Sequence, residues 1–145
     1  MALVFEERPM SNAEYAQESA AFDEHGSSFG NPPETTERRG FVAVEDGQFV
    51  GASSGLVQVS TGGYSPYFFL TDLLVVRAQR GRGYGARLLA LLEDRIREMG
   101  IKRIWTWTAE FEADGFYQRQ GYSVFAVQPG FYRSGHARIG LVKNL

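Results

Sequence analysis

Cysteine is absent from this chain of 145 residues, and histidine is scarce, with only His25 and His136. The first absence excludes a disulfide framework, a thiol nucleophile and a zinc–thiolate site. The two histidines lie far apart in the sequence, so we expect no metal site. No segment approaches the ~20 apolar residues that span a bilayer. The apolar start (MALVF) is too short for a signal peptide and turns acidic at once, so we expect a cytoplasmic protein with no membrane partner.

Charge of one sign is also lacking, because 15 basic and 17 acidic residues leave a net charge of −2. A nucleic-acid-binding domain normally carries a basic surface, so we expect no nucleic-acid partner. Hydrophobic residues make up 43% of the chain and aromatic residues 14%, which is enough for a packed core. The length is typical of one domain, and we expect a single domain over residues 1–145.

Hydrophobic periodicity and turn residues predict an order of elements along the chain. Ser11 and Glu14 form a capping-box pattern, which predicts a helix from Asn12 to about His25 that ends at Gly26. Strands are expected at residues 2–5, 41–44, 49–59, 67–76, 101–108, 122–127 and 136–142. Turns are expected at 46–47 and 61–66, and further helices after Gly83 and at 113–120. This order predicts an α+β, three-layer α/β/α domain. Its mixed, mostly antiparallel sheet would have 6–7 strands and one parallel crossover.

Residues 75–100 (VVRAQRGRGYGARLLALLEDRIREMG) carry the strongest local pattern: an apolar strand, a turn of glycines and arginines, and an amphipathic helix ending at Gly100. Gly81, Gly83 and Gly85 permit a tight turn whose N–H groups point at one spot. The helix adds its unpaired N-terminal N–H groups and the positive end of its dipole. With the neighbouring arginines, this pattern predicts a cradle for an anion, most simply a pyrophosphate.

Spacing separates the loops that build such a cradle. A Walker loop needs a Lys-Ser or Lys-Thr pair, which this chain lacks. A dinucleotide fingerprint is formally present as Gly81, Gly83 and Ala86, but four residues separate it from the strand and only about one βα unit follows. The pattern Gln/Arg-x-x-Gly-x-Gly/Ala fits residues 80–85 (RGRGYG) in full. In this loop the sequence resembles the GNAT superfamily of acyl-CoA-dependent N-acetyltransferases.

A second motif strengthens this resemblance. Residues 113–122 (ADGFYQRQGY) are similar to the family element Ala-x-x-Phe-Tyr-x-x-x-Gly-Phe/Tyr, at the usual distance downstream. The resemblance implies the acyl-CoA N-acyltransferase fold, with acetyl-CoA as cosubstrate and no metal. It assigns coenzyme binding to backbone groups of the preceding strand and to the glycine loop: Leu73, Leu74, Val75, Arg80, Gly81, Arg82, Gly83, Tyr84, Gly85 and Ala86.

The resemblance also suggests catalytic residues. Tyr117 occupies the position of a family phenol near the coenzyme sulfur, and it is our candidate general acid. Asp72 is the first candidate base, because burial in the apolar strand 67–76, expected to be covered on both faces, would strengthen it as a base. Glu110 is the second candidate, and it stands where the family often has an Asn that contacts the coenzyme. Trp105 and Trp107 alternate on one strand, where they either build core or stack on an acceptor.

These features together predict an N-acetyltransferase that moves an acetyl group from acetyl-CoA to a primary amine by direct attack in a ternary complex. The acceptor would be a small molecule or a peptide, and its identity stays open. A homodimer is expected by analogy with other proteins of this fold. Two alternatives remain: a non-catalytic acyl-CoA or CoA sensor, and an NAD(P)-dependent oxidoreductase that uses Gly81, Gly83 and Ala86.

Overall fold

The computed structural model describes residues 2–113 and 115–145. The chain forms two compact units, Met1–Glu34 and Thr35–Leu145, and each is described by itself. The expectation of a single domain stays a prediction. Among the described helices, none has both the length and the apolar character needed to cross a bilayer.

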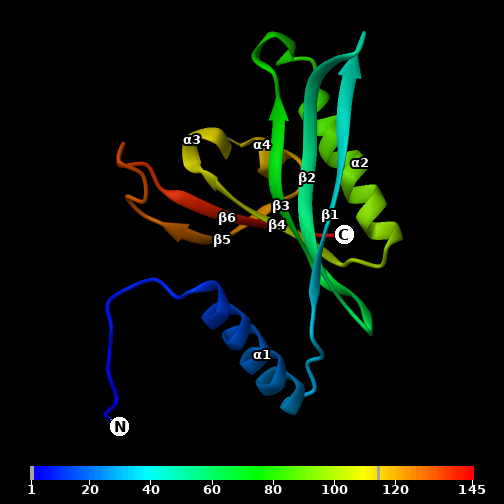
Figure 1. The fold of residues 1–145 in the computed structure, drawn as a ribbon. Helices are drawn as coiled ribbons and strands as arrows, with labels where there is room; N and C mark the ends of the chain where they lie inside the picture. Colours follow the sequence, from blue (N-terminus) through cyan, green and yellow to red (C-terminus); the bar gives the residue numbers. More distant parts are fainter. Residues whose placement is uncertain (1, 114) are drawn as a thin grey trace. The chain divides into compact units, whose positions relative to one another are not determined.

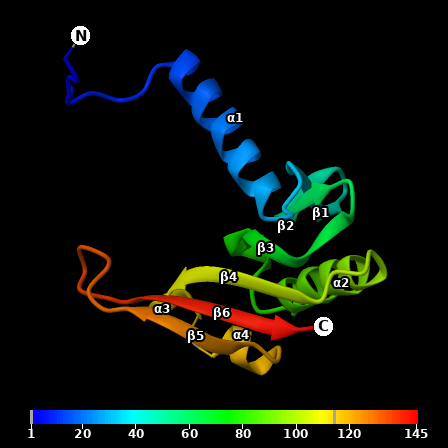
Figure 2. The ribbon, with the colours of Figure 1, turned by 90° about the horizontal axis from the view of Figure 1, so that it is seen from below.

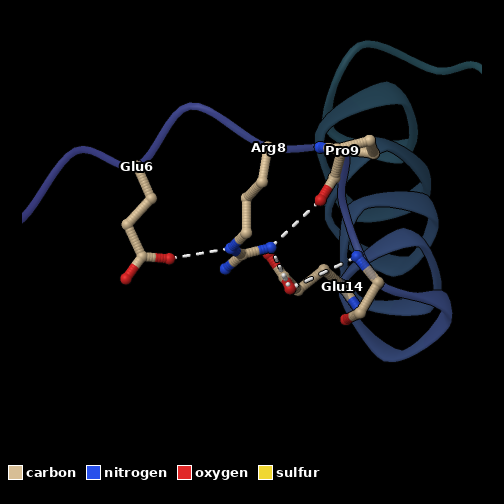
Figure 3. Close-up of polar contacts among 5 residues, drawn as sticks. Glu6, Arg8, Pro9 and Glu14 are labelled. Carbon is tan, nitrogen blue, oxygen red and sulfur yellow. Dashed lines mark hydrogen bonds and ion pairs between the residues drawn. The ribbon is translucent and has the colours of Figure 1, made fainter.

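The first unit contains one helix, α1 (Asn12–Ser28). The predicted capping box is present: the Glu14 N–H donates to Ser11 Oγ (3.2 Å), and the Ser11 N–H donates to Glu14 Oε1 (3.3 Å). Arg8 braces this start, since its guanidinium lies 2.9 Å from the Glu14 carboxylate and 2.7 Å from that of Glu6 (Figure 3). The predicted beginning of the helix is therefore confirmed.

Two expectations for this unit are wrong. Residues 2–5 form no strand, and Phe5 keeps 88% of its surface exposed, because an apolar run without a neighbouring strand has nothing to pair with. The helix also continues past Gly26. Its end is set by Gly30, whose φ of 84° supplies the left-handed residue that commonly follows a helix.

The second unit is built on a six-stranded sheet in the order β1-β2-β3-β4-β6-β5 (Figures 1 and 2). The strands are β1 (Thr35–Glu45), β2 (Gln48–Ser60), β3 (Gly63–Val75), β4 (Arg103–Ala109), β5 (Ser123–Gln128) and β6 (Arg138–Asn144). Only β3 and β4 pair in parallel, and the other neighbours are antiparallel. The predicted α+β fold with a mixed sheet and one parallel crossover is confirmed.

Helix α2 (Tyr84–Glu98) packs against β1, β2 and β3 (Figure 1). The apolar stripe expected from the sequence consists of Leu88, Leu89, Leu92, Ile96 and Met99. The first four are at most 3% exposed, whereas Met99, the C-cap of the helix, is only partly buried. The remaining helical segments are short: η1 (Arg77–Gln79), α3 (Glu110–Ala113) and α4 (Phe116–Arg119). Residues of α2 and α4 share one core with the facing side chains of the sheet.

One charged residue of α2 is buried, which the sequence pattern did not predict. Glu93 is 6% exposed. Its carboxylate accepts a hydrogen bond from the Tyr122 hydroxyl (2.7 Å) and one from Lys143 Nζ (2.8 Å). A buried carboxylate needs such partners, so these contacts tie α2 to β6 and to the residue that precedes β5.

The boundaries of three predicted segments shift most. The strand predicted at 41–44 is β1, which already begins at Thr35. The turn predicted at 61–66 is confined to Thr61 and Gly62, and β3 runs through Pro66. Pro66 is tolerated because the β2–β3 register is irregular there, and such an irregularity spares a ladder donor. The helix predicted at 113–120 is α4, which begins at Phe116. Asp114 of the second motif lies outside the described residues.

Candidate functional site

The two parallel strands of the sheet, β3 and β4, separate after a short paired stretch. β3 and β4 pair only at Tyr67↔Arg103, Phe68↔Ile104 and Phe69↔Trp105. Immediately beyond, the Thr106 hydroxyl donates to the Leu70 carbonyl (2.9 Å). The rest of β3 stays paired with β2 through Val75, so its backbone groups on the β4 side are left without a strand partner.

A bulge in β3 lies at this split. Ser54 of β2 pairs with Asp72, and the adjacent Gly55 pairs with Leu70, so Thr71 is the extra residue. Bulges bend a strand and end its pairing on one side. The irregular register therefore explains why β3 leaves β4 after Phe69.

A cavity of about 410 Å³ occupies the opening. The predicted backbone contributors Leu73, Leu74 and Val75 form one wall of it. The remaining lining comes from the glycine loop, the end of β4 and the helical segments that follow: Arg80, Gly85, Thr108, Glu112, Phe116 and Tyr117. Unpaired backbone donors beside a cavity can hold the amides or the carbonyl oxygen of a ligand.

The glycine–arginine loop forms a second cavity of about 340 Å³. It includes Gly81, Gly83, Tyr84 and Ala86, and it shares the walls Val75, Arg80, Gly85 and Phe116 with the first. The predicted coenzyme-binding residues therefore line two adjoining cavities, except Arg82, which lies in the loop between Gly81 and Gly83 without lining either.

The conformation of this loop agrees with an anion cradle. Gly81 and Gly83 have φ values of 79° and 80°, which favour glycine. Gly83 is the N-cap of α2 and has no side chain to satisfy the first helical N–H groups. These donors, with the helix dipole, attract an anion. Gly85 differs from the expectation, because it is already within the helix and does not take part in the turn.

Arg80 holds the loop against the strand, since its Nε donates to the Val75 carbonyl (2.9 Å). Among residues 2–113 and 115–145, no carboxylate forms an ion pair with Arg77, Arg80 or Arg82. Gln79 also lines the cradle, and its buried Oε1 has no hydrogen-bond partner among those residues. Uncompensated arginines around unpaired N–H groups fit a pyrophosphate-bearing ligand.

Tyr117 lies in α4 and lines the cavity in the split. Its ring is buried between Phe116 and Tyr122 in edge-on contacts with centroids 5.2 and 5.3 Å away. Burial raises the pKa of the phenol to about 12, and the carboxylate of Glu112 adds to the rise. The hydroxyl therefore keeps its proton at neutral pH, as a group that donates to a leaving atom must.

Asp72 lies at the bulge, but the expectation that it is buried is wrong. Its side chain is 62% exposed and pairs with Arg38 (3.4 Å), while the Thr71 hydroxyl donates to it (2.6 Å). The same error applies to β3 as a whole: Tyr67 and Leu74 are 46% and 50% exposed, because the helices that share the sheet's core pack on its other face. An apolar run alone does not show which face is covered.

Glu110 begins α3 directly after β4, at the position expected. Its carboxylate accepts a hydrogen bond from the Ala137 N–H (2.9 Å), and its own N–H donates to the Ala137 carbonyl (3.0 Å). This reciprocal pair fastens α3 to the start of β6. Glu110 lines neither of the two cavities.

Sequence reasoning missed four residues of the site: Gln79, Thr108, Glu112 and Phe116. Phe116 belongs to the second motif and lies in the wall that separates the two cavities, so the motif itself was the available signal. Glu112 lines the same cavity as Tyr117. No pattern in the sequence distinguished Glu112 from Glu110. Within the described ranges, no three His, Asp or Glu side chains gather in a way that could hold a metal ion.

Comparison with known proteins assigns this arrangement to a family. Residues 4–122 match the model of the Acetyltransferase (GNAT) family. A blasticidin-S acetyltransferase from Streptomyces morookaense is 40% identical over 109 residues, which cover 72% of this chain and 73% of that protein.

Solved structures share the fold. An acetyltransferase from Bacillus cereus superposes with a TM-score of 0.80 at 22% identity, over 97% of this chain and 98% of the other. An aminoglycoside 6'-N-acetyltransferase complexed with coenzyme A superposes with a TM-score of 0.60 at 21% identity, over 91% and 84%. The protein is an acyltransferase, and the chain belongs to the GNAT acetyltransferase family.

Proposed function

We propose that this acyltransferase moves an acetyl group from acetyl-CoA to a primary amine of a small molecule or peptide, by direct attack in a ternary complex. The observation that carries the proposal is that two cavities adjoin and share four lining residues, one cavity in the split between β3 and β4 and one in the glycine–arginine cradle. The aminoglycoside acetyltransferase that shares the fold was solved with coenzyme A, which supports the same cosubstrate here.

In this proposal the cradle binds the pyrophosphate of the coenzyme. The N–H groups at the start of α2 donate to its oxygens, and Arg80 and Arg82 balance its charge. Each hydrogen bond to a charged group contributes about 1.5–3 kcal/mol. The backbone groups of Leu73, Leu74 and Val75 that face away from β2, apart from the Val75 carbonyl that accepts from Arg80, receive the pantetheine amides and polarise the thioester carbonyl. One such donor typically stabilises a developing oxyanion by about 3 kcal/mol.

Tyr117 is the proposed general acid. During transfer the amine nitrogen bonds to the acetyl carbon and the carbon–sulfur bond breaks, so the sulfur needs a proton. The Tyr117 hydroxyl lies in the same cavity as the backbone groups of β3, and the high pKa of its phenol keeps that proton available. Solvent then returns a proton to the phenolate.

A carboxylate takes the proton that the amine loses. Asp72 stays our first proposal, because it lies at the bulge where the sheet opens and its exposure lets it act directly or through a water molecule. Glu110 remains the second, although its hydrogen bond to Ala137 gives it a structural task as well. Glu112 is a third, because it lines the cavity beside Tyr117.

The names of the relatives bear on the acceptor. Blasticidin-S and aminoglycosides, the molecules in those names, support a small-molecule amine over a protein as the acceptor of this chain. We further propose a cytoplasmic enzyme, since acetyl-CoA is an intracellular metabolite. We also propose a homodimer that pairs through the edge strand β5, on which Val124 and Val127 are 46% and 55% exposed.

Thiol release provides the test. The protein has no cysteine, so a thiol reagent reports only the coenzyme A that is freed. Purified protein is incubated with acetyl-CoA and a panel of small-molecule amines, and the acetylated product is identified by its mass. Release that depends on both substrates supports the transfer. Tight acetyl-CoA binding without release for any amine would favour a sensor. Binding of NAD in place of coenzyme A would favour the oxidoreductase.

A further inference from the structure

The sheet face opposite α2 carries a groove of about 490 Å³ that the proposed chemistry has not used. It is lined by Tyr67, Trp105, Trp107, Phe125 and Val142, which come from β3, β4, β5 and β6. Its size suits a small molecule. We name this feature the aromatic groove.

The rings of the groove hold one another in place. Trp105 stacks on Phe69 with ring centroids 4.3 Å apart and planes within 14°. Trp105 also meets Trp107 edge-on (6.3 Å), and Phe125 contacts both tryptophans. Gly140 of β6 makes this possible, because a Cβ there would lie 2.7 Å from the Phe125 ring and 2.9 Å from the Trp107 ring.

These rings are not fully buried core. Tyr67 and Phe125 keep 46% and 50% of their surface exposed, and both tryptophans are partly exposed. The core of the second unit lies on the other face, around Phe68, Ile104 and Leu141. An exposed and preorganised set of aromatic rings is typical of a surface that binds a flat ligand.

Positive charge borders the groove. The Arg138 guanidinium lies 4.7 Å from the centre of the Trp107 ring and 5.0 Å from that of Phe131. Arg103 lies 5.3 Å from the centre of the Tyr67 ring. Neither arginine forms an ion pair with a carboxylate among residues 2–113 and 115–145. A flat ligand with a carboxylate or carbonyl group would complement this border, whereas a polycation would be repelled.

The groove reaches the split in the sheet. Trp105 belongs to the last pair that joins β4 to β3, so Trp107 lies beyond the point of separation. Thr108, the next residue, lines the cavity on the opposite side of the sheet. Asp72 and Phe69 lie on the same face of β3. Their β2 partners, Ser54 and Leu56, are next-but-one neighbours in a strand and therefore lie on one face of the sheet.

We propose that the aromatic groove is the acceptor site, and that the acceptor is a flat aromatic or heteroaromatic amine with an anionic or carbonyl group at the end away from the amine. The ring lies against Trp105 and Trp107, the acidic group faces Arg138, and the amine points to the split beside Asp72. This proposal rests on the proposed acetyl transfer and narrows its substrate class.

The test compares two amines that differ only in the flatness of the ring. 4-(Aminomethyl)benzoate has an aromatic ring between its amine and carboxylate, and trans-4-(aminomethyl)cyclohexanecarboxylate has a saturated one. Stacking of one ring on aromatic side chains contributes about 1–3 kcal/mol, which corresponds to roughly 5- to 150-fold in affinity. We expect kcat/KM to be higher for the aromatic amine by that factor. We also expect its Kd, measured by quenching of tryptophan fluorescence, to be lower by the same factor.

Variants identify the groove as the source of the preference. Trp107→Leu keeps an apolar wall and should remove most of the preference for the flat ring. Arg138→Gln should weaken 4-(aminomethyl)benzoate about tenfold and leave benzylamine, which has no carboxylate, unchanged. Phe49→Leu removes an aromatic side chain that is 50% exposed outside the groove, and it should change neither value.

The outcomes separate the two proposals. Thiol release with equal kcat/KM for the two amines would overturn the groove assignment and leave acetyl transfer standing. Fluorescence that neither amine alters would overturn it too. If the wild-type protein is a dimer that does not bind the aromatic amine, and Trp107→Leu dissociates that dimer, a second copy of the chain covers the groove and the acceptor assignment is wrong. Absence of acetyl-CoA binding would remove the proposed function, while flat-ring binding would still be measurable by fluorescence.

Discussion

Replacement of Gly83 by alanine probes the cradle, because its effect on stability can be separated from its effect on binding. Gly83 has a φ of 80°, and no atom lies within 4 Å of a Cβ built there. The substitution therefore costs backbone strain without a clash. That strain is about 1–2 kcal/mol, which lowers the melting temperature by roughly 3–6 °C in a protein of this size.

Binding should suffer more than stability. Strain at the N-cap turns the first N–H groups of α2 away from the cradle, and the new methyl group stands in its wall. Loss of one charge-assisted hydrogen bond costs about 1.5–3 kcal/mol. We therefore expect the Kd for acetyl-CoA to rise roughly 10- to 100-fold in Gly83→Ala.

Gly47 offers a matched control in the turn between β1 and β2. Its φ is 75°, and a Cβ there also meets nothing within 4 Å. Gly47→Ala should lower the melting temperature by a similar amount and leave acetyl-CoA binding unchanged. Isothermal titration calorimetry with acetyl-CoA, together with thermal denaturation, measures both effects. Equal Kd values for the two variants, within about twofold, would refute the assignment of the cradle.

Three other substitutions test separate parts of the account. Tyr117→Phe should lower kcat about 100-fold with little change in the Kd for acetyl-CoA. Burial raises the pKa of the phenol to about 12, so the hydroxyl keeps its proton between about pH 8 and 10 and the wild-type rate should not fall there from its loss. A pH–rate profile that shows a Tyr117-dependent fall in this range would contradict the assignment. Asp72→Asn should lower kcat/KM while changing the free energy of unfolding by less than about 0.5 kcal/mol, since the exposed pair with Arg38 contributes little; a wild-type rate would exclude Asp72 as the base. Lys143→Met should lower the free energy of unfolding by about 3 kcal/mol in urea titrations, because it leaves the buried Glu93 carboxylate without its cation. The double variant Lys143→Met with Glu93→Gln should regain part of that loss. An unchanged free energy of unfolding in Lys143→Met would show that the Lys143–Glu93 pair does not stabilise the fold.

The raised pKa of Tyr117 also predicts how stability depends on pH. In the unfolded chain the phenol titrates near its usual pKa of about 10, and in the folded protein it titrates at about 12. Below about pH 10 both states hold the proton, and the full contribution to stability is present. Between those values only the unfolded state has lost it, so the free energy of unfolding falls as the pH rises. Thermal denaturation from about pH 8 to 11 measures this fall, which should be smaller in Tyr117→Phe.

Much of the fold could be predicted from the sequence because its signals are local. The capping box of Ser11 and Glu14, the turn at Asp46 and Gly47 and the apolar stripe of α2 each depend on residues close in the chain. The glycine loop was recognisable for the same reason, since Gly81 and Gly83 adopt the φ values that favour glycine and Gly83 is the N-cap of the helix.

The remaining features depend on packing between distant segments. The exposure of Asp72 follows from a bulge in β3 and from the absence of a covering helix on that face within the second unit, and neither is encoded by a local pattern. The partners of Glu93 come from two segments far along the chain. The aromatic groove likewise needs four strands in register, so alternation of Trp105 and Trp107 alone could not distinguish a core from a binding surface.

The measurement that tests the central claim most directly is calorimetric titration of the purified protein with acetyl-CoA, with coenzyme A and NAD titrated alongside. The account predicts micromolar binding of acetyl-CoA and coenzyme A and none of NAD, because the cradle, Arg80 and the unpaired backbone of β3 together fit a pyrophosphate with an attached pantetheine arm. Failure of a folded protein to bind coenzyme A would contradict it, and so would binding of NAD in its place.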